Sequence, residues 1–283
     1  MKIISKIVEM QKLSDKWRQE GESISFVPTM GSLHKGHLSL MEEGKKRGDR
    51  LIISIFVNPT QFGAGEDFKE YPHDFKRDSE LAKGVGVDVI FSPSIPEMYP
   101  EGFQSFVAID KLTKTLCGIS RPHHFQGVTT VVAKLFNIVK PHLAFFGKKD
   151  FQQLVVIQRM VKDLNYDLEV IGLPIIREDD GLAMSSRNKY LSREERVTAS
   201  SLNRSLILAR KMYQEGIRNA REIEKKVEQI VGENGLIKID YIRICDQENL
   251  LDIDRVNQKA QLAVAVNIGA TRLIDNCELG EEK

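Results

Sequence analysis

The sequence is poor in cysteine, has no excess of charge of either sign and contains no long apolar run. Its three cysteines, Cys117, Cys245 and Cys277, lie far apart and form no CxxC pair. Such an odd, scattered set argues against a zinc site or a disulfide framework, and it predicts reduced thiols in a cytoplasm. The formal net charge of +1 at pH 7 offers no electrostatic attraction for nucleic acid or for an anionic membrane.

No stretch of the chain is predicted to cross a membrane or to direct export. A spanning helix needs roughly 20 apolar residues, and the longest apolar runs, such as residues 51–57, are far shorter. The N-terminal residues 1–6, MKIISK, do not have the pattern of a secretory signal. We therefore expect a cytoplasmic protein with no nucleic-acid or membrane partner.

What the sequence does contain is an ordinary globular composition arranged as alternating strands and helices. Its 283 residues, with 41% apolar and 29% charged side chains, suit one large domain and a smaller one. Alternation of this kind predicts a Rossmann-like, doubly wound parallel sheet, and so an α/β fold. The expected strands are residues 24–27, 51–57, 87–91, 143–146 and 168–171, and the expected helices are 37–48, 73–83, 128–139 and 150–164.

The pattern changes after Pro174, where two helices precede a group of strands. Ser192 and Glu195 have the spacing of a capping box, which predicts a helix start. This helix is expected to run to about Gln214, with a second helix from about Asn219 and strands at 238–245, 261–267 and 271–274. We therefore expect a domain of residues 1–175 and a smaller C-terminal α+β domain of residues 176–283.

The most informative segment is PTMGSLHKGH, residues 28–37, between the strand at 24–27 and the following helix. Ligands of open parallel sheets bind at the carboxyl ends of strands, and a helix start there offers N–H groups to phosphate. Gly31 and Gly36 allow the backbone to approach a nucleotide closely. His34 and His37 are spaced to share one helix face, where two imidazoles could stabilise charge that develops on a phosphate.

The two histidines alone leave other interpretations open. An HxxH pair is also common on a solvated helix face, and it could contribute to a metal site. No third histidine or acidic ligand accompanies the pair, so we predict no metal site. A GxGxxG pattern is missing after this strand, which gives a dinucleotide-binding oxidoreductase no support.

Several motifs resemble one enzyme family. His34-Lys35-Gly36-His37 is similar to the HIGH signature of the nucleotidyltransferase superfamily, and residues 26–40 as a whole resemble the pantothenate synthetase family. The other matching motifs are residues 56–63 (FVNPTQFG), 116–128, 145–153 (FFGKKDFQQ), 181–188 (GLAMSSRN) and 272–276 (RLIDN). The chain departs from the family at His123, where glycine is usual; His124 is the histidine that matches.

The resemblance implies ATP-dependent condensation of pantoate with β-alanine through a pantoyl adenylate. Mg²⁺ would be bound through the triphosphate, and the enzyme would be a homodimer. By resemblance, His34, His37 and Lys149 are catalytic, and Gln61 and Gln153 bind pantoate or β-alanine. The residues expected to contact ATP are Met30, Gly31, Ser32, Leu33, His34, Lys35, Gly36, His37, Gly147, Lys148, Lys149, Asp150, Ile176, Met184, Ser185, Ser186 and Arg187.

The chemistry of these residue types fits those roles, although plainer interpretations exist. Lys149 can place an ammonium group on phosphates, and Asp150 can accept hydrogen bonds from ribose, but Asp150 could also simply cap a helix. Two hydroxyls and a guanidinium at residues 185–187 can hold leaving pyrophosphate. A loop of the C-terminal domain would then close over the site and exclude water from the adenylate.

Three rival functions remain at this point. Other nucleotidyltransferases and tRNA synthetases share the HIGH signature, but a synthetase needs RNA-binding mass and a basic surface. An NAD-dependent oxidoreductase would use a similar sheet with a different glycine pattern. A nucleotide sensor without catalysis would keep the fold, yet every matched site residue is present in this sequence.

Overall fold

The computed structural model describes residues 1–233 and 235–280, which form two compact units. The first unit consists of Met1–Asp110, Arg121–Lys148 and Val156–Pro174. The second consists of Lys111–Ser120, Lys149–Val155 and the described residues from Ile175 onward. Two short segments that precede Pro174 in the sequence thus belong to the second unit.

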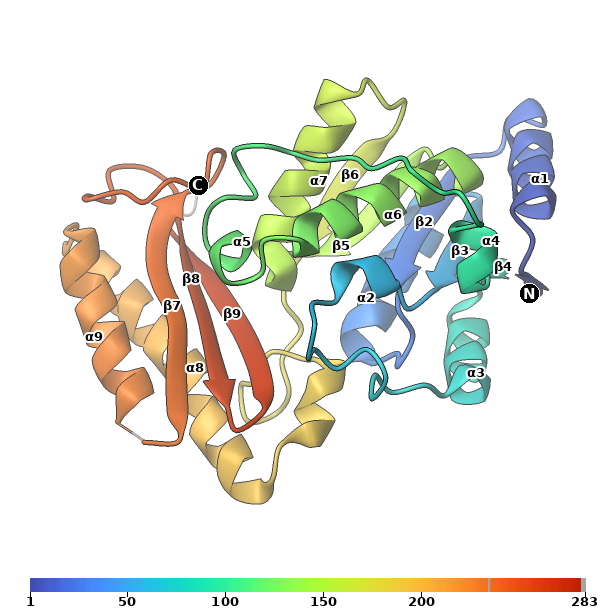
Figure 1. The fold of residues 1–283 in the computed structure, drawn as a ribbon. Helices are drawn as coiled ribbons and strands as arrows, with labels where there is room; N and C mark the ends of the chain where they lie inside the picture. Colours follow the sequence, from blue (N-terminus) through green and yellow to red (C-terminus); the bar gives the residue numbers. More distant parts are fainter. Residues whose placement is uncertain (234, 281–283) are drawn as a thin grey trace. The chain divides into compact units, whose positions relative to one another are not determined.

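The first unit is built on a six-stranded sheet in the order β1-β4-β3-β2-β5-β6 (Figure 1). Every pairing in this sheet is parallel, which confirms the predicted Rossmann-like α/β class. Its strands are β1 (Lys2–Ile4), β2 (Ile24–Thr29), β3 (Arg50–Ile55), β4 (Val89–Phe91), β5 (Leu143–Gly147) and β6 (Glu169–Leu173).

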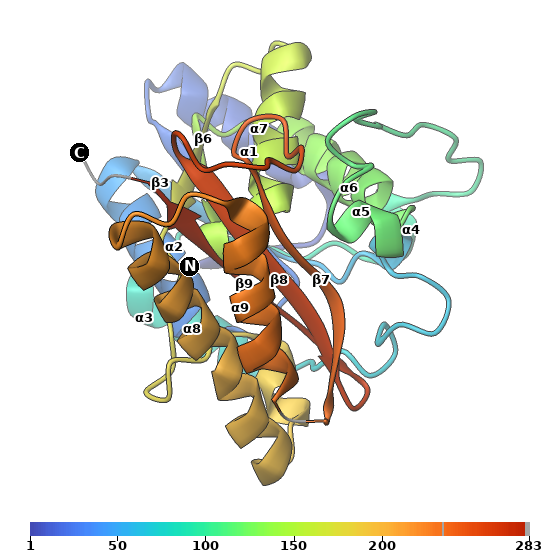
Figure 2. The same cartoon turned by 90° about the vertical axis from the view of Figure 1, so that its left-hand side faces the viewer.

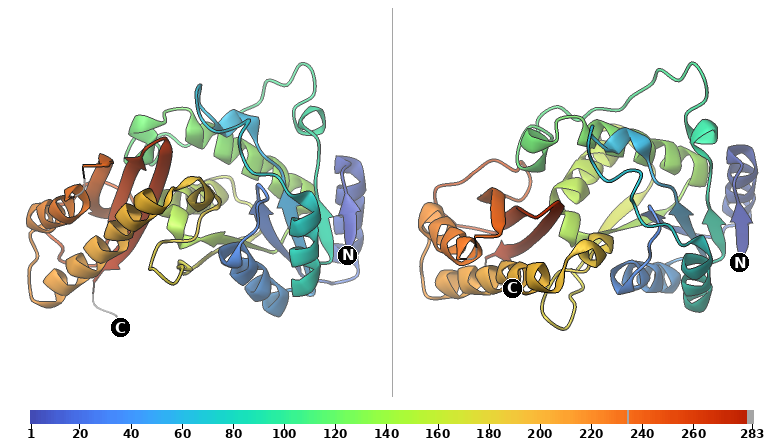
Figure 3. Two further views of the ribbon diagram at one scale, coloured as in Figure 1. Left: turned by 90° about the horizontal axis from the view of Figure 1, so that it is seen from below. Right: turned by 60° about the horizontal axis from the view of Figure 1, so that its bottom comes forward.

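Helices cover both faces of this sheet, as a doubly wound fold requires. Val27, Ile53 and Ile90 are register partners on one face, where they pack against α2 (Lys35–Arg47) and α3 (Phe75–Val85). Figure 3 shows α2 and α3 side by side. The longer α6 (His124–Val139) packs against α1 (Ile7–Gln19) and β2, and α7 (Phe151–Asp163) links β5 to β6.

The sheet reverses its winding direction between β2 and β5. From β2 the chain winds through α2, β3 and α3 to β4, whereas β5 and β6 extend the sheet on the other side of β2. Such a switch point is where open α/β sheets bind ligands, outside the carboxyl ends of the strands. These ends are Thr29 in β2 and Gly147 in β5.

Short elements complete the first two-thirds of the chain. The one-turn helices are η1 (Pro59–Gln61), α4 (Ile95–Met98), α5 (Cys117–Ser120), η2 (Lys148–Asp150) and η3 (Ser186–Tyr190). Among the described residues, no helix combines the length and the apolar character that a membrane span would need.

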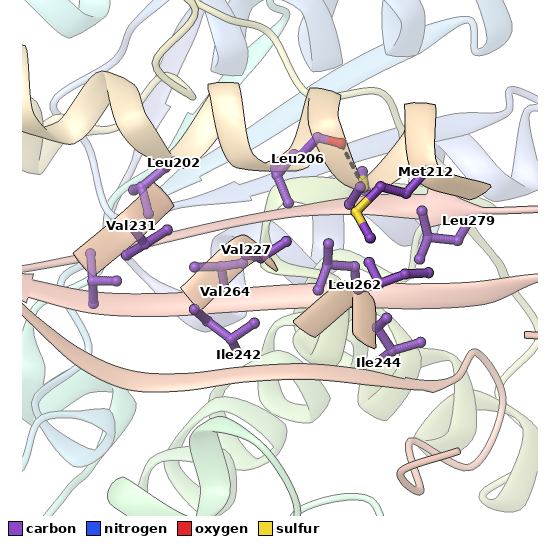
Figure 4. Close-up of a cluster of buried hydrophobic side chains, with 14 of the residues drawn as sticks. Leu202, Leu206, Met212, Val227, Val231, Ile242, Ile244, Leu262, Val264 and Leu279 are labelled. Atoms are coloured by element: carbon purple, nitrogen blue, oxygen red, sulfur yellow. Dashed lines mark hydrogen bonds between the residues drawn. The ribbon is translucent and has the colours of Figure 1, made fainter. Parts of the chain in front are cut away.

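The second unit contains an antiparallel sheet of β7 (Ile237–Asp246), β8 (Ala260–Ile268) and β9 (Thr271–Leu279). Figure 2 shows α8 (Arg193–Gln214) and α9 (Ala220–Gly232) against one face of this sheet. Their apolar side chains form a core with alternate residues of the strands (Figure 4). The smaller α+β unit expected from the sequence is confirmed.

The predicted capping box is present at the start of α8. The Ser192 hydroxyl accepts a 3.2 Å hydrogen bond from the Glu195 N–H, and the Glu195 carboxylate accepts a 2.8 Å bond from the Ser192 N–H. Two backbone donors that a helix start would leave unpaired are thus satisfied. The helix is followed by Gly216, whose φ of +94° suits glycine at a helix end.

Candidate functional site

A tight loop joins β2 to α2 at the carboxyl edge of the first sheet. Gly31 and Ser32 have φ values of +85° and +50°, so both lie in the left-handed region. Glycine takes this conformation without steric cost, whereas other residues need support from their surroundings. A Cβ atom at Gly31 would also lie 3.1 Å from the Asp78 carboxylate. The glycine therefore permits both the turn and the close approach of α3.

Asp78 in α3 supplies the support that Ser32 requires. Its carboxylate accepts hydrogen bonds from the N–H groups of Ser32, at 2.7 Å, and Leu33, at 2.8 Å. The residue is only 1% exposed, although a run of charged residues around it suggests a solvated helix face. These two N–H groups are thus used inside the protein, and a nucleotide contact by Ser32 or Leu33 would have to involve other atoms.

The imidazoles of His34 and His37 lie face to face at the start of α2. Their ring centroids are 4.0 Å apart with an interplanar angle of 33°. Nδ1 of His34 accepts from the Gly36 N–H at 3.1 Å, and Nδ1 of His37 accepts a longer bond, 3.4 Å, from the His34 N–H. Because Nδ1 is the acceptor in both rings, each neutral ring carries its proton on Nε2. The histidines therefore orient two N–H donors from one helix start.

Gln61 of η1 is brought next to the β2–α2 loop. Its amide nitrogen lies 3.2 Å from the Met30 sulfur, and its amide oxygen accepts a 3.0 Å bond from the Asn58 side chain. Asn58 is 1% exposed and also donates to the Gly127 carbonyl at 3.1 Å. The buried Asn58 thereby fixes which end of the Gln61 amide faces Met30.

The backbone of Gln61 is held from the other side by two residues of the 121–124 segment. The His124 ring nitrogen Nδ1 lies 2.9 Å from the Gln61 carbonyl, so it must carry the proton and donate. Arg121 donates to the same carbonyl at 3.3 Å and pairs with Glu66. Burial raises the pKa of the Glu66 carboxyl, but the hydrogen bonds and charge of Arg121 outweigh it and leave the pKa below its usual value. His123, in contrast, is exposed.

Helix α6 passes very close to Gln61 at Gly127. A Cβ atom at this position would lie 2.3 Å from the Thr60 carbonyl oxygen and 2.6 Å from the Gln61 Cα. Both distances are shorter than non-bonded atoms tolerate, and both neighbours are backbone. The absence of a side chain at Gly127 therefore sets where Gln61 can lie.

Gly127→Ala is expected to lower the free energy of unfolding by about 1–3 kcal/mol, because the added methyl group forces backbone apart in a packed region. Gly84→Ala is the matched control, since Gly84 is also helical but a Cβ atom there would have no neighbour within 4 Å. That control should be neutral or stabilising by up to about 1 kcal/mol. Urea denaturation of both variants measures the difference, and a Gly127→Ala protein as stable as the parent would contradict the close approach.

The Lys149–Gln153 segment belongs to the second unit. The Lys149 ammonium lies 4.0 Å from the Asp150 carboxylate, a loose ion pair that leaves its charge largely uncompensated. Neighbouring glutamines behave differently: Gln152 is buried and bonds to the backbone of Leu112 and Cys117, at 2.8 and 3.0 Å. Gln153 is half-buried, so it is the glutamine of the pair that lies nearer the surface.

The predicted pyrophosphate loop is a closed turn in the second unit. The Met184 N–H donates to the Ile176 carbonyl at 2.9 Å, and Arg177 forms a β-bridge with Ala183. Gly181 makes the turn with φ of +85°. The Ser185 hydroxyl then caps η3 by accepting from the Arg187 N–H at 3.3 Å. Ile176, Met184 and residues 185–187 are thereby tied into one local structure.

The predicted site residues therefore form two sets. In the first unit, Met30 to His37, Gln61 and the end of β5 at Gly147 and Lys148 are grouped around the switch point. Lys149, Asp150, Gln153, Ile176 and residues 184–187 belong to the second unit. The sequence did not predict that Asp78 supports the β2–α2 loop or that Asn58 orients Gln61. It also did not indicate that Gly127 packs directly against the backbone of Gln61.

Comparison with known proteins gives one consistent family. A family model described as pantoate-beta-alanine ligase matches residues 2–278. The pantothenate synthetase of Syntrophus aciditrophicus (strain SB) is 57% identical over 282 residues, which cover 100% of this chain and 99% of that protein.

Two solved structures agree with this family. The pantothenate synthetase of Thermus thermophilus has a TM-score of 0.94 at 43% identity, and the match covers 99% of this chain and 100% of that chain. The pantoate-beta-alanine ligase of Francisella tularensis, complexed with beta-gamma ATP and beta-alanine, has a TM-score of 0.81 at 34% identity, covering 98% and 97% of the two chains.

Proposed function

The chain belongs to the pantoate-beta-alanine ligase family, and we propose on this basis that it condenses pantoate with β-alanine through a pantoyl adenylate. A carboxylate is a poor acceptor for an amine, because an oxide ion would have to leave. In the first step the pantoate carboxylate attacks the α-phosphorus of ATP, and pyrophosphate leaves. In the second step the amine of β-alanine attacks the activated carbonyl, loses a proton and displaces AMP, which yields pantothenate.

The pair of imidazoles at the start of α2 supports this proposal most directly. Negative charge grows on the α-phosphate oxygens while the pantoate oxygen bonds and pyrophosphate leaves. The Nε2–H groups of His34 and His37 donate to those oxygens without any proton transfer being required. Both rings are oriented by backbone hydrogen bonds, so little reorganisation is needed as the charge develops.

The residues of the second unit act on the remaining phosphates. Lys149 places its ammonium on the triphosphate, and residues 184–187 hold the β- and γ-phosphates until pyrophosphate departs. Ile176, Lys149 and Asp150 contact the nucleoside part and the phosphates, as do Gly147 and Lys148 of the first unit. Closure of the second unit over bound ATP protects the adenylate from water.

Pantoate is held by the amides of Gln61 and Gln153. The carboxylate of pantoate can only accept hydrogen bonds, so the Gln61 amide nitrogen is the group that binds it. Asn58 keeps the Gln61 oxygen turned away from Met30, which leaves the amide nitrogen directed to the β2–α2 loop. Pro28, Met30 and Phe62 offer apolar surface to the gem-dimethyl carbon of pantoate.

Mg²⁺ enters with the triphosphate. Among the described residues, no group of three or more His, Cys, Asp or Glu side chains is placed to bind a metal ion. Mg²⁺ often needs few protein ligands; bound through the triphosphate, as the family resemblance implies, it would offset part of the phosphate charge. The working form of the enzyme is a homodimer, as the family resemblance implies. It acts in the cytoplasm, in keeping with its three scattered cysteines.

Pyrophosphate exchange tests the reaction. The protein is mixed with ATP, Mg²⁺ and labelled pyrophosphate, and we expect label to return to ATP only when pantoate is added. β-Alanine should instead draw the adenylate forward, with AMP and pantothenate formed in equal amounts. Exchange without any acid, or with amino acids in place of pantoate, would contradict the proposal and favour another nucleotidyltransferase.

A further inference from the structure

We propose that Asp275 and Asn276, two adjacent residues of β9, are positioning residues for the two ATP-binding segments of the second unit. The inference rests on the roles proposed above for Lys149 and for residues 184–187. Asp275 and Asn276 are 2% and 6% exposed. Their partners across the sheet are the apolar residues Val264 and Ala263, so this strand carries two polar side chains where apolar ones would pack.

Asn276 fixes the backbone of Lys149. Its side-chain nitrogen donates to the Lys149 carbonyl at 2.8 Å, and its oxygen accepts from the Gln261 amide at 2.6 Å. Gln261 is in turn held by Gln247 at 3.1 Å. Each amide thus has its orientation set by the next, since a flip would bring two donors or two acceptors together. The main chain of Lys149 is therefore anchored to β9 through a buried polar chain.

Asp275 fixes the loop that contains residues 184–187. Its carboxylate accepts two hydrogen bonds from Arg177, at 2.7 and 3.0 Å, in a bidentate pair. The same guanidinium donates to the Gly181 carbonyl at 3.0 Å, across the turn closed by the bridge of Arg177 to Ala183. Asp275 thereby holds the turn from which Met184 and residues 185–187 continue.

The two contacts leave β9 on opposite faces of the sheet. Successive strand residues point to opposite sides. Asp275 shares its face with Leu273 and Cys277, which belong to the core under α8 and α9. Asn276 lies on the other face, where it meets the Lys149 segment. Asp275 and Asn276 therefore hold two segments that are distant in sequence. Lys149 in one segment and Ile176 in the other are 27 positions apart.

The strength of these anchors follows from burial. A buried carboxylate or amide that lost its partner would pay a desolvation penalty, so each side chain favours the arrangement in which its partner stays in place. A displacement of about 1 Å in a catalytic group can lower a rate by about 100-fold. Loosening either anchor should therefore slow adenylate formation while leaving pantoate binding nearly unchanged.

Asn276→Ala is expected to lower kcat for pantoate-dependent exchange by roughly 10- to 100-fold, with little change in the KM for pantoate. The same substitution in a Lys149→Ala background should have at most a twofold effect, because Asn276 acts through Lys149. Asp275→Asn alone should lower kcat by a similar factor, and it should have at most a twofold further effect in an Arg187→Ala background. Steady-state exchange kinetics of the single and double variants of the full chain complete a double-mutant cycle for each of the two pairs.

Glu224→Gln is the matched control. Glu224 is 6% exposed and accepts a 2.8 Å bond from the Ile244 N–H in the same unit, but it contacts neither ATP segment. It should lower the melting temperature to a similar degree and leave kcat unchanged. Should the alanine variant fail to fold, Asn276→Asp keeps the side-chain volume, removes the donor and gives a second measurement.

Wild-type kcat in folded Asn276→Ala and Asp275→Asn would overturn the inference, as would losses that persist fully in the double variants. These outcomes differ from failure of the proposed function. If Lys149→Ala exchanged pyrophosphate at the parent rate, the role of Lys149 would fail first. If Lys149→Ala were inactive and Asn276→Ala normal, the proposed function would stand without this inference.

Discussion

Replacing His37 with alanine is expected to lower the rate of pantoate-dependent pyrophosphate exchange by about 100- to 1,000-fold. The substitution removes one Nε2–H donor to the α-phosphate. It also removes the acceptor for the His34 N–H, so the cap of α2 loses one of its two hydrogen bonds. Since the donor is needed most where charge has developed, kcat should fall far more than the KM for ATP rises.

His123→Ala provides the control for this experiment. His123 is exposed, and its side chain makes no capping hydrogen bond at the start of α6. Exchange by this variant should match the parent. His37→Asn adds a second comparison, because an amide can donate a hydrogen bond but is a poor general acid. Near-parental rates for His37→Asn would identify a hydrogen-bonding role for His37. A parental rate for His37→Ala would instead contradict the proposed binding of the α-phosphate at the start of α2.

The sequence was a good guide to the main sheet because buried parallel strands carry continuous apolar runs. The strand expected at 51–57 appears as Arg50–Ile55, and the helix expected at 150–164 appears as Phe151–Asp163. β1 was missed, since three residues, Lys2–Ile4, are too short to show a period. Its pairing with β4 is a tertiary contact that local pattern does not encode.

The last strand shows a different limit. It was expected to end at residue 274, because Asp275 and Asn276 are residue types common in turns. In the structure the strand extends to Leu279. Both are satisfied by partners far away in sequence, Arg177 and Lys149. A polar pair inside a strand becomes intelligible only after those partners are known, which is why pattern reasoning ended the strand too early.

The site shows the same division between local signal and tertiary support. The residues around His34 and His37 stand out because glycine, histidine and a strand end coincide within ten positions. Asp78 does not stand out, because a carboxylate in a charged run looks solvated until α3 is placed against the β2–α2 loop. Residues that contact a ligand can be recognised as a sequence motif. The residues that position those side chains can be identified only from the folded structure.

Lys149→Ala is expected to lower the exchange rate by about 100-fold or more, because an ammonium group on the triphosphate offsets charge that moves toward pyrophosphate. The Lys149 side chain is 21% exposed and its ion pair with Asp150 is 4.0 Å long, so the charge remains available to a ligand. The variant should fold with nearly parental stability, since a loose, partly exposed ion pair contributes little. Exchange kinetics and a urea denaturation curve measure the two quantities.

Lys162→Ala and Lys149→Arg make the result specific to this position. Lys162 is an exposed lysine near the end of α7, the helix that follows η2, so its removal changes the net charge equally and should leave exchange unchanged. Arginine keeps the charge of Lys149 but replaces a compact ammonium with a planar guanidinium. If position as well as charge matters, Lys149→Arg should fall between the parent and Lys149→Ala. Equal losses in Lys149→Ala and Lys162→Ala would instead mean that only the overall charge attracts ATP, and Lys149 would no longer be a catalytic residue.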